Sequence, residues 1–311
     1  RYHRLIYRVC RNFAQRPYRR INKIKPHNMS KKLIRFDWAV KKILRHKANF
    51  GILAGFLSEL LMFDVTIETI LESEGNKQYE YDKYNRVDIL LRTTQNELVL
   101  VEIQNDPEKD YFQRMIYGVS KLVTEYIKEG EPYGTIKKIF SINIVYFELG
   151  QGKDYIYEYK GEFVGMHSGK VLLPTPSQKK AYNVEKVSDI FPKYYLLKIN
   201  NFDDNAKDTL DEWIYFLKNS EIKSEFKAKG LDEAREKLRY EQLSEQDKQT
   251  YNRYQENRRI EISVTETAID GRLRKVALKS IAKGLDNQFI ADITGLSIEF
   301  VEILRNDPTA E

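Results

Sequence analysis

The feature that most constrains the fold of this chain is a pair of short segments in which apolar residues alternate with other side chains. The two segments flank a polar break over residues 93–97. Alternation with a period of two on both sides of a short polar break is typical of a β-hairpin, and it predicts one over residues 85–104. The alternating apolar positions are Val87, Ile89, Leu91, Val99, Val101 and Ile103.

The segments around this hairpin show patterns of helices and further strands. Apolar residues recur at helical spacing over 33–46, 50–63 and 110–129. An apolar run over 136–148 predicts a buried strand, and the tyrosine-rich segment 154–160 predicts another. Two prolines follow, and we expect them to close this core near residue 176.

The rest of the chain is expected to be mostly helical. We expect a mixed, then helical extension of the core over 177–230, and a solvated helix over 231–263, where acidic and basic residues are interspersed. The tail 264–311 predicts a small unit that resembles a helix-turn-helix, with Ser297 as an N-cap. Its last helix carries two glutamates, which favours protein packing or regulation over DNA reading, because DNA binding requires basic side chains.

The positive charge of the chain is concentrated at its beginning. The chain has a formal net charge of +6, but residues 1–28 hold nine Lys and Arg and no acidic residue. The remainder has 43 basic and 46 acidic side chains, a net charge of −3. Because Met29-Ser30-Lys31-Lys32 looks like an ordinary start of translation, we expect 1–28 to be a basic extension upstream of a true start at Met29. A nucleic-acid-binding arm and an Arg-rich transit segment are the alternatives.

Several classes of protein are excluded by composition and motifs. No run approaches 18 uninterrupted apolar residues, so no membrane-spanning helix is predicted. The single cysteine, Cys10, excludes a disulfide framework and a cysteine-based zinc site. Gly150-Gln151-Gly152 lacks the third glycine of a dinucleotide-binding turn and no P-loop is present, so no nucleotide cofactor is expected. We expect a cytoplasmic protein.

The two strands of the predicted hairpin each carry a carboxylate among apolar residues. If the turn is centred at Gln95, cross-strand partners have residue numbers that sum to 190, and Asp88 lies opposite Glu102. Directly opposed residues have Cβ atoms about 4.5–5.5 Å apart. Gln104 lies on the same face as Glu102 because strand side chains alternate.

Two opposed carboxylates in apolar strands destabilise the pair unless something compensates their charge. A divalent cation would do so, and oxygen ligands suit Mg²⁺, Mn²⁺ or Ca²⁺. Alternatively, Asp88 and Glu102 lie at exposed strand ends and pair with Arg86 or with lysines. A shift of the turn by one residue would also place the two carboxylates on opposite faces.

Four segments, taken in this order and spacing, resemble the Rpn family of recombination-promoting nucleases, also described as PD-(D/E)XK nuclease family transposases. The resemblance extends from about Met29 to Pro174. It implies an α/β, restriction-endonuclease-like core, in which a central mixed sheet is flanked by helices, and metal-dependent cleavage of DNA phosphodiester bonds. The four segments are Phe36-Asp37-Trp38-Ala39-Val40-Lys41-Lys42, Phe56-Leu57-Ser58-Glu59-Leu60-Leu61, Val101-Glu102-Ile103-Gln104 and Phe112-Gln113-Arg114-Met115-Ile116-Tyr117.

The resemblance also implies roles for individual residues. Asp88 and Glu102 would be catalytic and hold the metal, Mg²⁺ or else Mn²⁺ or Ca²⁺. Glu59 would be an additional metal ligand, with an ordinary surface glutamate as the alternative. Gln104 stands where many members have lysine; it can hydrogen-bond water or phosphate but cannot carry a charge. A lysine or arginine from elsewhere would then substitute, or activity would be low.

The helix predicted over 110–129 is the natural supplier of DNA contacts, because several of its polar residues share a face at spacings of three and four. These candidate phosphate contacts are Gln113, Arg114, Tyr117 and Lys121. Burial of the tyrosine on the core, with the other side chains solvated, is the alternative. In the first helix, Asp37 and Lys41 have the spacing and order of a helix salt bridge.

We therefore expect a metal-dependent DNA endonuclease associated with recombination or mobile elements. Its partner would be DNA, its location the cytoplasm and nucleoid of a prokaryote, and a homodimer would suit double-strand cleavage. A catalytically inactive DNA- or protein-binding module of the same fold is the first alternative. Strand transfer, as in transposition, is the second.

Overall fold

The computed structural model describes residues 33–71, 88–126 and 130–308, which divide into two compact units. The first ends at Gln242 and the second begins at Leu243. The basic extension expected over 1–28, the start expected at Met29, and Arg86 lie outside the described residues. No helix of the described part is long and apolar enough to cross a membrane.

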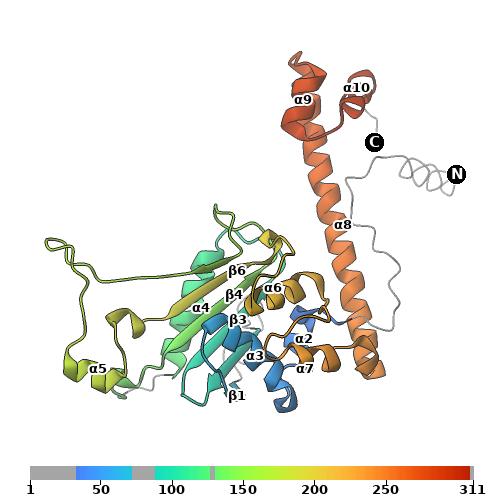
Figure 1. Ribbon diagram of the computed structural model, residues 1–311. Coiled ribbons are helices and arrows are strands. Elements are labelled where there is room, and N and C mark those ends of the chain that lie inside the picture. Colours follow the sequence, from blue (N-terminus) through green and yellow to red (C-terminus); the bar gives the residue numbers. More distant parts are fainter. Residues whose placement is uncertain (1–32, 72–87, 127–129, 309–311) are drawn as a thin grey trace. The chain divides into compact units, whose positions relative to one another are not determined.

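The first unit contains a mixed sheet of six strands in the order β1-β2-β3-β4-β6-β5 (Figure 1). β2 pairs antiparallel with β1 and β3, whereas β3, β4 and β6 run parallel, and β5 pairs antiparallel with β6. The strands are β1 (Ile67–Leu71), β2 (Ile89–Thr93), β3 (Leu98–Gln104), β4 (Ile139–Val145), β5 (Ile156–Glu158) and β6 (Lys193–Lys198).

The hairpin of β2 and β3 has the register that the sequence predicts. Ile89 pairs with Val101 and Leu91 with Val99, so partner numbers sum to 190. Asn96 closes the turn in the left-handed conformation, with φ of 63°, which asparagine tolerates better than most residues. The predicted register of this hairpin is therefore confirmed for every pair from Ile89 to Arg92.

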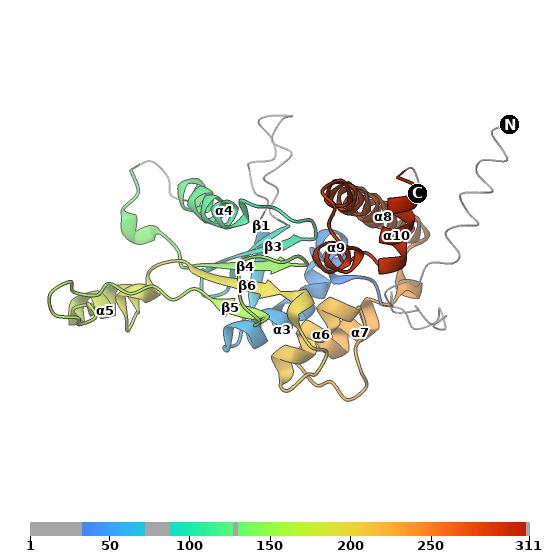
Figure 2. The ribbon, with the colours of Figure 1, turned by 90° about the horizontal axis from the view of Figure 1, so that it is seen from above.

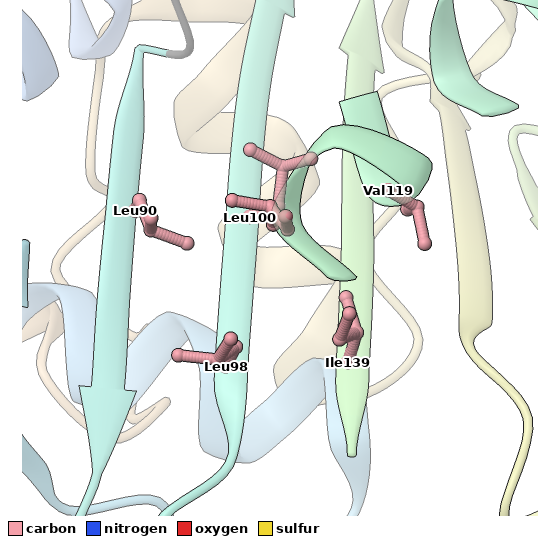
Figure 3. Packing of buried hydrophobic residues seen from close by; sticks show 6 residues of the cluster. Leu90, Leu98, Leu100, Val119 and Ile139 are labelled. Atoms are coloured by element: carbon pink, nitrogen blue, oxygen red, sulfur yellow. The ribbon is translucent and has the colours of Figure 1, made fainter. Parts of the chain in front are cut away.

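Helix α4 (Tyr111–Tyr126) covers one face of the sheet, and α3 (Phe50–Leu61), α6 (Thr209–Asn219) and α7 (Leu231–Lys237) lie on the other (Figure 2). Beneath α4, leucines that alternate along β2 and β3 pack against the buried side of the helix (Figure 3). Because side chains alternate along a strand, the face that carries these leucines also carries the two carboxylates, Asp88 and Glu102, farther along the hairpin. The cluster consists of Leu90, Leu98, Leu100, Val119, Leu122 and Ile139.

The helices on the other face meet in an aromatic cluster. Phe36 of α2 (Phe36–Lys42) lies 5.8 Å from Phe56 of α3 and 6.1 Å from Trp213 of α6, measured between ring centroids. Trp213 is fully buried, and its indole N–H donates to the backbone oxygen of Lys229 at 3.1 Å. This cluster fixes α2, the helix that contributes side chains to the site described below.

The sheet extends farther along the chain than the sequence analysis indicates. β6 inserts between β4 and β5 after a long excursion that contains α5 (Pro176–Tyr182). This segment was expected to be mixed, then helical, without a defined strand, because the place of β6 in the sheet depends on its non-local pairing with β4. With this strand, the architecture is the mixed sheet flanked by helices that was expected.

The second unit is helical, as expected for the tail. It consists of α8 (Glu245–Ala282), α9 (Asn287–Thr294) and α10 (Ile298–Asn306). α8 runs without interruption through the boundary expected between residues 263 and 264, and the charged helix expected over 231–263 is divided between α7 and α8. Ser297 caps α10 as predicted, since its hydroxyl accepts from the backbone N–H of Phe300 at 3.2 Å.

Ser297→Ala is expected to destabilise the last helix by about 1 kcal/mol, because the alanine leaves an N–H at the start of α10 without its acceptor. Hydrogen exchange of the amides of α10 would measure the loss as faster exchange. Ser263→Ala, at an exposed position within α8, provides a control that should leave exchange in α10 unchanged. Equal protection of α10 in both variants would contradict the capping role.

Candidate active site

The two carboxylates predicted to face each other come together at one end of the β2–β3 hairpin. Glu102 lies in β3 on the face covered by α4, and the register places Asp88 opposite it, one residue before β2 begins. Asp88 Oδ2 accepts a hydrogen bond of 2.7 Å from the N–H of Ile103. The carboxyl ends of parallel strands are where open α/β sheets place their sites, and β3 reaches this end beside β4.

Glu102 is the more buried of the pair. Its side chain is 9% exposed, and its Oε2 atom has no hydrogen-bond partner among the described residues. The nearest cation is Arg114 of α4, whose Nε lies 3.6 Å from Glu102 Oε2. Burial raises the pKa of Glu102 to about 7, although Arg114 opposes the shift; the charges of Asp88 and Glu108 raise it further.

Asp88 is held by two groups from the α2 region. Lys41 Nζ lies 3.2 Å from Asp88 Oδ1, and the guanidinium of Arg45 donates to the backbone oxygen of Asp88 at 2.6 Å. Burial raises the pKa of Asp88, although Lys41, the N–H of Ile103 and Arg114 each act to lower it. Both carboxylates therefore resist ionisation, each with a single cation close by.

Helix α4 forms the cover above Glu102. Arg114 also pairs with Glu108 at 2.9 Å, so its guanidinium is shared between two carboxylates. Gly118 lies so close to the sheet that a methyl group there would be 3.9 Å from Glu102 Oε1. Tyr111, the first residue of α4, is fully buried, and its hydroxyl lies 3.5 Å from the amide oxygen of Asn143.

Asn143 continues the polar surface into β4, where it pairs in register with Glu102. Its amide nitrogen donates to Ser141 Oγ at 2.9 Å and to the backbone oxygen of Tyr195 at 3.2 Å. The amide is therefore fixed with its oxygen towards Tyr111. Asn143 is a polar residue of the site that the sequence analysis missed, because residues 136–148 were interpreted from their apolar positions alone, as a buried strand.

The end of β3 is tied to the beginning of α2. Gln104 is partly exposed, and its amide nitrogen donates to the backbone oxygen of Asp106 at 3.3 Å. The next residue, Asn105, donates to Asp37 Oδ2 at 3.2 Å, and Asp37 also pairs with Arg35. The salt bridge that spacing suggests between Asp37 and Lys41 is thus replaced: Asp37 contacts Arg35 and Asn105, and Lys41 contacts Asp88.

The remaining predicted site residues lie elsewhere or have other contacts. Glu59 accepts hydrogen bonds from the hydroxyl of Thr209 at 2.6 Å and the backbone N–H of Lys229 at 3.1 Å, which link α3 to α6 and to the loop before α7. On α4, Lys121 lies 3.7 Å from Glu125, whereas Gln113 and Tyr117 are exposed.

The site offers two carboxylates to a metal ion. In the described part of the chain, no group of three or more His, Cys, Asp or Glu side chains could hold one, so Glu59 does not complete a set with Asp88 and Glu102. Two carboxylates fit Mg²⁺, which keeps several waters and is commonly bound through one or two carboxylates and substrate phosphates. The buried, unpartnered oxygen of Glu102 fits the same interpretation.

Comparison with known protein families adds an independent observation. Residues 34–175 match the family model described as PD-(D/E)XK nuclease family transposase. This segment is similar to that family. The match contains both carboxylates and confirms the resemblance drawn from the sequence. Searches of curated proteins and of solved structures found no match.

The PD-(D/E)XK assignment explains the arrangement of the first unit. The matched residues 34–175 contain α2, α3, α4 and the strands β1 to β5 but not β6, and they carry Asp88, Glu102 and their cationic neighbours. The assignment supports a nuclease-like function with DNA as the substrate class. Lys41 and Arg45 at Asp88 are the functional candidates that sequence spacing missed, because a contact between α2 and the hairpin has no local signal.

Proposed function

We propose that this chain is a metal-dependent DNA endonuclease that hydrolyses phosphodiester bonds, acting in recombination or in mobile elements. The observation that carries the proposal is the opposition of Asp88 and Glu102, two largely buried carboxylates with raised pKa values. Burying two such carboxylates side by side is unfavourable unless a partner such as a cation compensates their charge. Perturbed carboxylates gathered at one site are characteristic of catalytic centres.

Asp88 and Glu102 would hold a divalent cation, Mg²⁺, Mn²⁺ or Ca²⁺, which when bound polarises a phosphate and lowers the pKa of a water molecule. The chain's own residues fix the geometry. The N–H of Ile103 orients Asp88, and Arg114 holds Glu102 from above. Tyr111 and Gly118, both on α4, lie over the same face of the sheet, where Tyr111 contacts Asn143 and Gly118 leaves room beside Glu102.

The charge missing from Gln104 is provided by Lys41 in this proposal. Gln104 lies on the same strand face as Glu102 and can hydrogen-bond water or phosphate without carrying charge. Lys41 Nζ is 3.2 Å from Asp88 Oδ1, and its side chain is 51% exposed, so it can reach a substrate phosphate. A homodimer, with one such site for each strand of the duplex, would cleave both strands.

A catalytically inactive binding module is the alternative, and one observation favours it. Lys41 and Arg114 already lie beside the two carboxylates, so the pair is partly neutralised without a metal. In such a protein, the site would bind DNA or protein and leave the phosphodiester bond intact. Metal affinity and cleavage separate the two functions.

Cleavage of supercoiled plasmid by the full chain tests the proposal. We expect nicked or linear product with Mg²⁺ or Mn²⁺ and none with EDTA, because hydrolysis requires the cation at Asp88 and Glu102. Agarose electrophoresis resolves the three plasmid forms. Intact plasmid with every metal, from a protein whose circular dichroism shows a folded state, would refute the nuclease and favour the binding module.

A further inference from the structure

A basic segment adjoins the candidate site and is not explained by the carboxylates themselves. Residues 41–47 read Lys-Lys-Ile-Leu-Arg-His-Lys and contain no acidic side chain. All five of the basic positions are exposed. The chain from residue 29 onward is not basic, since it has a net charge of −3.

The segment is anchored on both sides. Leu44, at its centre, is fully buried, and its N–H donates to the backbone oxygen of Ala39 at 2.9 Å. The amide of Asn49 donates to the backbone oxygen of Ile43 at 2.9 Å and fixes the turn that follows α2. The cationic side chains therefore project from a fixed backbone, which lowers the entropy lost when a ligand binds.

The segment touches the site at one residue. Lys41 and Arg45 contact Asp88 through its carboxylate and its backbone oxygen, at 3.2 Å and 2.6 Å. Among the described residues, the pair of Lys41 and Asp88 is the only ion pair that the segment forms. Lys42, His46 and Lys47 therefore have no carboxylate to neutralise them. Lysines in the last turn of α2 complement the helix dipole, but that does not account for Arg45, His46 and Lys47, which follow the helix.

We infer that residues 41–47 bind the phosphate backbone of the nucleic-acid strand and lead it to Asp88. The inference rests on the proposed function for its substrate and adds the surface on which that substrate lies. Exposed cations held in a row attract phosphates through the release of counterions. Arg114 and Lys121 of α4 are less suited to this role, because their side chains are only 22% and 25% exposed, whereas that of Lys41 is 51% exposed.

Binding of a fluorescent DNA duplex of about 30 base pairs tests the inference. We would measure anisotropy with EDTA present, so that neither cleavage nor a metal contributes. The double variant Lys42→Gln/Lys47→Gln should weaken binding at least about tenfold at 0.1 M salt. The slope of the logarithm of the binding constant against the logarithm of the salt concentration should fall by the amount expected for about two phosphate contacts. Neither lysine contacts Asp88, so the carboxylates stay as they are.

Lys170→Gln/Lys180→Gln is the matched control, because it removes the same charge at two other exposed positions of the same unit. Lys180 belongs to α5, which lies at the opposite end of the sheet from α2 (Figure 1). The control should bind within about twofold of the unchanged chain. Equal losses in the two variants, no loss in the first, or stronger binding to phosphatidylserine vesicles than to the duplex would overturn the inference.

The outcome is independent of the cleavage assay. A chain that binds through this segment and leaves plasmid intact keeps the inference and refutes the nuclease. A chain that cleaves plasmid, with unchanged binding in Lys42→Gln/Lys47→Gln, keeps the nuclease and refutes the inference.

Discussion

Asp88→Asn and Glu102→Gln are each expected to lower the rate of metal-dependent plasmid cleavage by at least about 100-fold, since even the outer partners of a metal ligand cost 10- to 100-fold when removed. Both changes keep the shape of the side chain and remove its charge. The amide oxygen at position 88 can still accept from the N–H of Ile103, so the backbone contact of 2.7 Å survives. The loss would therefore report the charge of the carboxylate.

Asp106→Asn and Glu125→Gln are the matched controls. Asp106 is exposed beside Gln104, and Glu125 pairs with Lys121 on α4, away from the two central carboxylates. Both variants should cleave within about twofold of the unchanged chain, because single surface charges and ion pairs near the surface contribute little. If Asp88→Asn retained more than a tenth of the activity, the cleavage would come from another site or another protein.

The local part of this site could be predicted from the sequence. A two-residue period fixes the face of each strand side chain, and a short polar turn fixes the register, so the opposition of Asp88 and Glu102 follows from the residue numbers. Ser297 was likewise found from its position before a helix. These features depend on neighbours within about 20 residues, where pattern and geometry are closely coupled.

The missed features depend on contacts between distant segments. Lys41 has the right spacing for a helix salt bridge with Asp37, yet the fold brings it to Asp88, 47 positions farther along. β6 is a strand only because β4 is available beside it. Such contacts are decided by the packing of α2 and α4 on the sheet, which no local period encodes.

The second large effect concerns stability in the absence of metal. Glu102→Gln is expected to raise the free energy of unfolding by about 3 kcal/mol at pH 8 and by less than about 1 kcal/mol at pH 5. In the folded chain the pKa of Glu102 is about 7, compared with its usual 4.5. Between these values the folded state binds a proton that the unfolded state has released, so the stability of the unchanged chain falls as pH rises through this window.

Glutamine removes this penalty because it is neutral at every pH in the window and has the same shape. Arg114 keeps a partner after the substitution, since Glu108 lies 2.9 Å from it. Urea unfolding at pH 5 and pH 8 with EDTA measures the difference, and Glu125→Gln should change stability by less than about 0.5 kcal/mol at both values.

The sign of this effect separates a functional carboxylate from a structural one. If Glu102 served to hold α4 through Arg114, its replacement would destabilise the chain at both pH values, because a buried ion pair loses one member. Stabilisation that develops between pH 4.5 and pH 7 and persists above it, together with lost cleavage, would show that the fold tolerates an unfavourable charge for the sake of the reaction. With Mg²⁺ present, the unchanged chain should become more stable than Glu102→Gln, because Mg²⁺ binding requires the ionised carboxylate. If Mg²⁺ stabilised both proteins equally, Glu102 would not be a ligand.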